Sequence, residues 1–327
     1  MSRKQERSKK KLEKNPIAEC NKIQNKYYPE LFAKFAEVND PRNQSYIDYP
    51  VRVMLGAMYY KCIGGISSMQ EMTRKFNDDE VVENLYSFMG ETKKEYLPHG
   101  VTENEFLARL NPVELEKIQK DIAYSMIRRK TFDDARVLKR WQIIIDATEL
   151  DEGYQKKNEY YLSRCYNRGE ADEFTKYHRS VLEAKLYLGN NLVCSIASEP
   201  IQNSEEYINQ REEKVKQDCE SKAFIRLAEK IKKRFPRLPV IITADGLYAS
   251  QKVIQTTDNG WDYIIRYKEG SASSITKEYQ SLPEKEKIGS EIEYQNQIIF
   301  QSLDVNLIYY TEKEIKSDGK EQLTEFA

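Results

Sequence analysis

Two short isoleucine-rich runs constrain the fold of this chain more than any other feature. One is WQIIID, which ends at Asp146, and the other is VIITAD, which ends at Asp245. Short runs of β-branched residues are typical of strands that are buried on both faces, as in sheets covered by helices. We therefore expect a buried strand that stops at each aspartate, in a fold of the α/β class.

The segments around these runs predict a central mixed sheet with helices packed on it. A Gly-Asn-Asn turn at 189–191 is typical of a hairpin between two strands. An apolar stripe at helical spacing predicts one long helix from about Ser204 to Phe235. The polar, tyrosine-rich stretch 153–177 is interpreted as a loop. The other expected strands are 180–189, 191–201 and 263–270.

Before Trp141 the apolar residues repeat at helical spacing. The pattern from Val51 to Cys62 predicts a helix, and Pro112 suits the first turn of another. The first fifteen residues hold seven Lys or Arg against two Glu and almost no apolar side chain, so we expect a disordered tail. The predicted parts are a disordered basic tail over 1–15, a helical N-terminal domain over 16–140, an α/β core over 141–270, and an incomplete β-rich segment over 271–327.

The composition excludes several classes of protein. Lys and Arg number 52 against 53 Asp and Glu, so any partner with many negative charges needs a local basic surface. The five cysteines lack C-x-x-C spacing and there are only two histidines, which argues against a disulfide framework or a histidine-rich zinc site. Phosphate-loop, esterase and dinucleotide-binding motifs are absent. If the chain is an enzyme, carboxylates must carry its chemistry.

The sequence also bears on location. No apolar run approaches the roughly 18 residues of a membrane span. No secretory signal pattern opens the chain. We expect a soluble, cytoplasmic protein that has no membrane partner.

Asp146 and Asp245 are the strongest candidates for a site. Reactive groups in α/β proteins gather at the carboxyl ends of buried strands, so the two carboxylates converge if their strands are neighbours. A divalent cation that prefers oxygen ligands, Mg²⁺ or Mn²⁺, relieves the repulsion between two such carboxylates and is typical of phosphoryl-transfer sites. The alternative is that each aspartate is a turn or cap residue.

Five segments carry a resemblance to one family. They are DPRNQSYIDYPVRVMLGAMYYKCIGGISSMQEM, WQIIIDATEL, HRSVLEAKLYLGNNLVCSIASEPIQN, KQDCESKAFIRLAEKIKKRFPRLPVIITADGLYA and YIIRYKEG. In order and wording they resemble the DDE transposases of bacterial insertion sequences, over roughly residues 40–270.

The resemblance implies a fold, a reaction and partners. The implied fold is α/β, a ribonuclease-H-like mixed sheet flanked by helices and preceded by an all-α N-terminal domain. The implied reaction is cutting and joining of transposon ends, with Asp146 and Asp245 as the first two catalytic metal ligands. The implied partners are double-stranded DNA, as transposon ends and target, and a second copy of the chain in a synaptic complex. The mild excess of 26 basic over 21 acidic residues up to Arg140 points the helical part toward DNA.

One departure from the family concerns its third metal ligand, a Glu on a helix beyond a β-rich insertion. The acidic candidates after residue 270 lie in polar or β-like settings, namely Glu312, Glu314, Glu321 and Glu325. We therefore expect no third catalytic Glu, a chain that stops inside the insertion, and little or no strand transfer by this polypeptide alone.

Weaker expectations concern contacts with DNA. Arg164 and Arg168 lie among tyrosines in 153–177, where a basic, aromatic loop suits a nucleic-acid backbone and splayed bases, although an ordinary solvated loop explains them equally. Arg266 and Lys268 follow the second aspartate and suit phosphate, or serve to protect a sheet edge. Glu183 and His178 are near enough to assist a metal-bound water, or are partly exposed sheet residues.

Two rival interpretations remain open. One is a nuclease of the same fold. The other is a non-catalytic DNA-binding remnant that keeps the N-terminal helices and has lost its chemistry.

Overall fold

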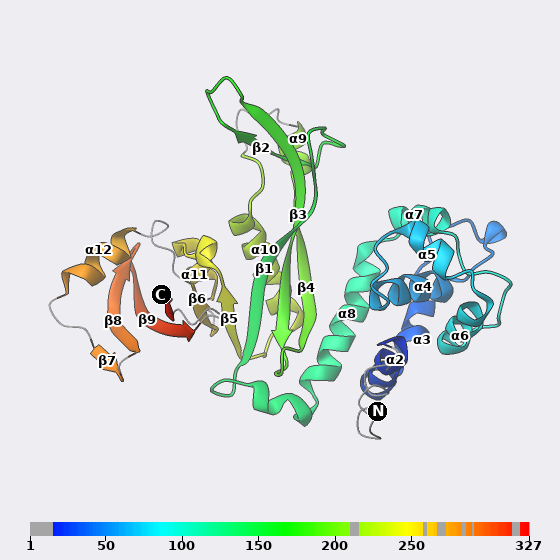
Figure 1. The fold of residues 1–327 in the computed structure, drawn as a ribbon, viewed down its shortest axis with the longest axis horizontal. Coiled ribbons are helices and arrows are strands. Elements are labelled where there is room, and N and C mark those ends of the chain that lie inside the picture. The colour runs from blue at the N-terminus through cyan, green and yellow to red at the C-terminus, as the bar shows by residue number, and fades with distance from the viewer. Residues whose placement is uncertain are drawn as a thin grey trace. The chain divides into compact units, whose positions relative to one another are not determined.

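The computed structural model of the chain describes residues 16–209, 216–257, 260–266, 273–282, 286–289, 291–315 and 321–326. The basic tail 1–15 and Lys268 lie outside the described residues. The chain divides into two compact units, one up to Arg129 and one from Lys130 (Figure 1). The break therefore precedes the change of pattern at 140, because a short 3-10 helix over Lys130–Ala135 belongs to the second unit.

The regular elements described in the first unit are helices. Both expected helices are confirmed, the first ending at Ile63 with Gly64 as its C-cap and the second beginning at Pro112. Aromatic and aliphatic side chains from several helices form one core around the first of these, with Tyr60 and Met54 fully buried. The elements are α2 (Pro16–Tyr27), α3 (Leu31–Ala36), η1 (Gln44–Tyr46), α4 (Val51–Ile63), α5 (Met69–Lys75), α6 (Asp79–Met89), α7 (Gly100–Arg109) and α8 (Pro112–Ile127).

The second unit is built on a six-stranded mixed sheet. Its central strand β1 runs antiparallel to β3 on one side and parallel to β5 on the other, and β6 continues the parallel side. Both β2 and β4 pair antiparallel with β3. This arrangement is consistent with a ribonuclease-H-like fold. The strands are β1 (Trp141–Gly153), β2 (Leu162–Tyr166), β3 (Phe174–Tyr187), β4 (Val193–Ile201), β5 (Val240–Ala244) and β6 (Asp262–Ile265).

The expected hairpin turn is confirmed between β3 and β4. Gly189, Asn190 and Asn191 all have positive φ, a conformation that glycine and asparagine tolerate best. The amide of Leu188 donates to the carbonyl of Leu192 at 2.9 Å and closes the hairpin. The turn therefore places β4 antiparallel beside β3.

Two expectations about the strands are wrong. The first strand does not stop at Asp146 but continues to Gly153, because β3 pairs with it along this whole length, with an irregularity between Glu149 and Asp151. The stretch 153–177 is not only loop, since it contains β2 and the beginning of β3. Its polar side chains reflect exposure to solvent rather than absence of a strand.

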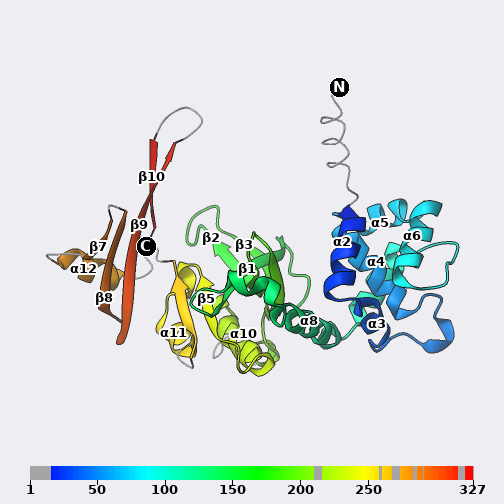
Figure 2. The same ribbon diagram turned by 90° about the horizontal axis from the view of Figure 1, so that it is seen from below.

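The single helix expected from Ser204 to Phe235 is also wrong. The chain forms α9 (Glu205–Asn209) and α10 (Glu220–Arg234), and residues 216–219 between them are not helical. Cys219 has an extended backbone, with φ of −154°. The apolar stripe of α10 nevertheless packs on the sheet as expected, with Phe224 and Leu227 fully buried against the side of β3 and β4 (Figure 2).

The end of the chain forms a second, four-stranded antiparallel sheet in the order β10-β9-β8-β7. Helix α12 (Ser273–Ser281) packs against it (Figure 2). The core between them extends to Ile254 of α11 and includes the fully buried Phe300. This sheet is more extensive than the short β stretches expected. The elements are η3 (Gly246–Tyr248), α11 (Gln251–Thr257), α12 (Ser273–Ser281), β7 (Glu286–Ile288), β8 (Ile292–Phe300), β9 (Leu303–Ile315) and β10 (Glu321–Phe326).

Among the residues that the structure describes, no helix combines the length and the apolar character needed to cross a membrane.

Candidate functional site

Asp146 lies on β1, and Asp245 directly follows β5, the parallel neighbour of β1. The parallel pairing of β1 with β5 runs from Trp141 opposite Val240 to Ile144 opposite Thr243. Continued by two residues, this register places Asp146 beside Asp245. Because residues opposite each other in register point to the same face of a sheet, this register puts the two side chains on one face, on strands about 4.8 Å apart.

Local hydrogen bonds orient both carboxylates. Asp146 is exposed, and its Oδ1 accepts a hydrogen bond from the amide of Ala147 at 3.0 Å. Asp245 is half-buried and caps η3, with its Oδ1 accepting from the amide of Leu247 at 2.9 Å. Below them, Gln142 Nε2 donates to Thr243 Oγ1 at 3.0 Å and ties β1 to β5 on the same face. The two aspartates therefore extend from a well-paired part of the sheet.

A third carboxylate, Glu183, lies next to Asp146, so that Asp245, Asp146 and Glu183 form a row of carboxylates. Glu183 of β3 is directly opposite Asp146 in the antiparallel pair, so their Cβ atoms are about 5 Å apart. In the described structure Glu183 forms an ion pair with Lys185 at 3.1 Å. Three neighbouring strands thus bring Asp245, Asp146 and Glu183 to one face of the sheet.

A basic side chain ends the row on its other side. The amide of Arg266 donates to the carbonyl of Ala244 at 2.9 Å, which extends the parallel pairing of β5 and β6 by one residue. Arg266 is therefore the register neighbour of Asp245, and it is exposed. Of the residues expected to contact DNA, the sheet brings this one to the aspartates.

Arg164 and Arg168 lie elsewhere. Arg164 of β2 is opposite Lys176 of β3, an odd number of residues from Glu183, so it lies on the other face of the sheet. Arg168 is exposed in the turn after β2. Around Arg164 the rings of Tyr166 and Phe174 stack at 5.0 Å between centroids, on a partly exposed aromatic surface.

Below Asp245, a buried tyrosine links the turn to α10. Tyr248 is 1% exposed, and its hydroxyl donates to Glu220 Oε2 at 2.8 Å. Burial raises the pKa of Tyr248, and the hydrogen bond to Glu220 and the negative charges of Glu220, Asp245 and Asp146 raise it further.

The donor set fits a divalent cation in part. Carboxylate oxygens are the ligands that Mg²⁺ and Mn²⁺ prefer, and Asp146 and Asp245 supply them from adjacent strands. Within the described ranges, however, no three His, Cys, Asp or Glu side chains are grouped closely enough to hold a metal ion. Glu312 and Glu314 lie on β9, and Glu321 and Glu325 lie on β10. The two aspartates thus provide part of a ligand set.

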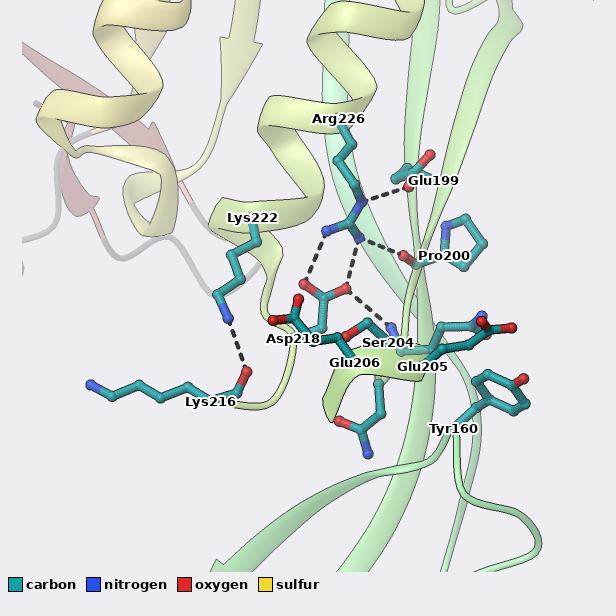
Figure 3. Close-up of a pocket in the computed structure, with 12 residues that line it drawn as sticks. Tyr160, Glu199, Pro200, Ser204, Glu205, Glu206, Lys216, Asp218, Lys222 and Arg226 are labelled. Carbon is teal, nitrogen blue, oxygen red and sulfur yellow. Dashed lines mark hydrogen bonds and ion pairs between the residues drawn. The ribbon is translucent and has the colours of Figure 1, made fainter. Parts of the chain in front are cut away.

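A cavity of about 560 Å³ lies between β4, α9 and α10, where an ion-pair network joins the elements (Figure 3). Arg226 donates from Nη2 to Asp218 at 2.7 Å and from Nε to Glu199 at 2.7 Å, and it also donates to the carbonyl of Pro200 at 3.0 Å. The hydrogen bond to Asp218 is the main cause of a raised pKa of Arg226. This network joins Asp218, in the non-helical segment before α10, to Arg226 of α10 and to the end of β4.

Comparisons with known proteins add little to this geometry. The sequence matches no protein-family model and no curated protein. Among solved structures, the chain is similar to one described as "Mos1 transposase paired-end complex with left transposon end". The sequence identity is 14% and the TM-score is 0.19, over 68% of this chain and 60% of that chain. The match spans less than two thirds of that chain, and so low a TM-score leaves the site to be interpreted from its own residues.

The sequence indicated two members of this constellation and missed others. Asp146 and Asp245 were indicated by the buried runs before them. Glu220 was missed, because an acidic residue in the first turn of a helix is explained by the helix dipole alone. The sequence feature that could have indicated Tyr248 is its place in the segment DGLY, three residues after Asp245.

Proposed function

We propose that this chain is a DNA transposase that cuts and joins transposon ends by metal-dependent phosphoryl transfer at Asp146 and Asp245. The observation that carries the proposal is the parallel register of β1 and β5, whose last pair, Ile144 and Thr243, lies two residues before Asp146 and Asp245. The mixed sheet with flanking helices, consistent with a ribonuclease-H-like fold, also supports it. The resemblance of the sequence to DDE transposases points to the same reaction.

The charges of the row suit this chemistry. Two adjacent carboxylates repel each other in the absence of a cation, and Mg²⁺ or Mn²⁺ bound between them would remove that repulsion. Such an ion polarises a phosphodiester and lowers the pKa of a bound water. Arg266, next to Asp245 in register, is a cation placed to meet a DNA phosphate. The proposed partners are double-stranded DNA and a second copy of the chain.

The proposal is tested by Mn²⁺ titration of the full chain, followed by electron paramagnetic resonance. Asp146→Asn and Asp245→Asn are each compared with the wild type and with Asp304→Asn, which changes an exposed aspartate of the other sheet. We expect both site variants to lose the tightest class of Mn²⁺ sites and the control to keep it. DNA affinity, measured on the same samples, should stay unchanged. If neither site variant alters Mn²⁺ binding, the proposed function is wrong.

One observation favours a second candidate, a DNA-binding protein without catalysis. Among the described residues no third ligand completes the metal site. Nicking of supercoiled plasmid in Mn²⁺ distinguishes the two candidates, since a non-catalytic protein would bind the plasmid without cutting it. A nuclease of the same fold would nick the plasmid but would not join a transposon end to it.

A further inference from the structure

The turn that carries Asp245 has its own backbone support. Asp245 Oδ1 accepts from the amide of Leu247 at 2.9 Å, and the amide of Tyr248 donates to the carbonyl of Asp245 at 3.1 Å. The direction of the carboxylate is therefore coupled to the position of the whole turn.

Tyr248 provides a tertiary contact for this turn. Its ring packs on Phe224 of α10, with centroids 5.7 Å apart, and Gly246 before it is buried. Its hydroxyl reaches Glu220 in the first turn of the same helix, 28 residues earlier in the chain. A buried hydroxyl that loses its acceptor is costly, so this hydrogen bond specifies where the ring, and with it the turn, lies.

We propose that Glu220 is a positioning residue for the candidate site. By accepting the hydrogen bond of Tyr248, Glu220 holds Asp245 in line with Asp146. The inference rests on the proposed function, because it concerns the same pair of aspartates. Glu220 itself need not touch the cation. Residues that orient metal ligands in this way typically change metal affinity by roughly 10- to 100-fold when they are altered.

A matched control is found where α12 packs on the second sheet of the same unit. Tyr279 of α12 is also buried, and its hydroxyl donates to Glu293 Oε2 at 3.0 Å. Tyr279→Phe therefore removes the same kind of hydrogen bond as Tyr248→Phe, away from the row of carboxylates. Both changes keep the packed ring.

The experiment is the Mn²⁺ titration of the full chain with four further variants, together with urea unfolding of each. Asp146→Asn should abolish one class of Mn²⁺ sites. We expect Tyr248→Phe and Glu220→Ala to weaken the Mn²⁺ affinity of these same sites by about 10-fold or more. Glu220→Gln, whose amide oxygen still accepts from the phenol, should restore affinity to within about threefold of the wild type. Tyr279→Phe should leave the affinity unchanged at a similar loss of stability.

Failure of this inference is distinguishable from failure of the proposed function. If the wild type has no Mn²⁺ sites that depend on Asp146, the proposed function falls, and the positioning role falls with it. If those sites exist but Tyr248→Phe and Glu220→Ala bind Mn²⁺ as the wild type does, only the positioning role is wrong. It is equally overturned if Glu220→Gln binds as weakly as Glu220→Ala, since the hydrogen bond would not be the cause. The glutamate variants keep the test valid if Tyr248→Phe does not fold.

Discussion

Asp146 on β1 and Asp245, which directly follows β5, each lie two residues past the last pair of the parallel ladder between these strands, Ile144 and Thr243. Two carboxylates so placed repel each other unless a cation lies between them. Two like charges 4 Å apart interact by about 1 kcal/mol even in water, which sets the scale of the effect.

The first prediction concerns stability without metal. In the presence of a chelator, Asp146→Asn should raise the free energy of unfolding by up to about 1 kcal/mol, because it removes this repulsion. Mg²⁺ should stabilise the wild type but not the variant. Urea unfolding with and without Mg²⁺ measures both effects, with Asp304→Asn as the control. A chelated variant less stable than the wild type would contradict the prediction.

A second prediction concerns DNA binding by the cation of the row. Arg266→Ala should weaken DNA binding and reduce the slope of log affinity against log salt by about 1, as expected for one lost phosphate contact. Arg164→Ala, on the opposite face of the sheet, should change the slope less. Fluorescence anisotropy over a range of salt concentrations measures this. Equal slopes for Arg266→Ala and the wild type would exclude the contact.

The third prediction concerns the pH dependence of the first unit. Glu103 of α7 is 0% exposed, and both of its carboxylate oxygens lack a hydrogen-bond partner. Burial raises the pKa of Glu103 to about 8, against an opposing effect of Arg42. Between the ordinary glutamate pKa of 4.5 and a pKa of about 8, the folded state therefore holds a proton that the unfolded state has released.

Stability should accordingly fall as pH rises through this window, by up to about 1.4 kcal/mol per pH unit from this group. Glu103→Gln should flatten the profile and be more stable than the wild type at pH 8. Urea unfolding at pH 5, 6.5 and 8 checks this. Glu105→Gln, an exposed neighbour on the same helix, is the control and should leave the slope unchanged. A wild-type profile without a fall toward pH 8 would refute the prediction.

The fourth prediction concerns the ion-pair network beside the cavity. Arg226→Ala leaves the carboxylates of Asp218 and Glu199, whose side chains are 8% and 14% exposed, without this cation. Because Arg226 is itself 41% exposed, we expect a loss of about 1–2 kcal/mol rather than the full cost of a buried pair.

Asp218→Asn should then restore part of the stability lost by Arg226→Ala, because it removes the uncompensated charge. A double-mutant cycle in urea measures the coupling between these two residues. Arg237→Ala, an exposed arginine after α10, serves as the control. Additive effects of the two substitutions would show that Arg226 and Asp218 do not stabilise each other.

Much of the architecture was predictable from local pattern. The runs before Asp146 and Asp245 indicated two strands, and these strands are neighbours at the centre of the sheet. Burial on both faces was expected, but before Asp146 β1 alternates between buried and half-buried residues, whereas β5 is buried at four of its five positions. The hairpin at 189–191 and the helix that begins at Pro112 were also indicated, because glycine, asparagine and proline restrict the backbone locally.

The sequence by itself determined which segments are buried, where several helices begin, and that carboxylates are the main candidates for chemistry. Tertiary structure decided the rest. The extension of β1 to Gly153 depends on pairing with β3, and Arg226 of α10 bonds to Asp218 in the non-helical segment before that helix. The link from Glu220 to Tyr248 joins residues 28 positions apart. The spacing of apolar residues indicates which face of an element is buried. Which strand pairs with which, and which charged side chains form ion pairs, depends on how distant segments pack together.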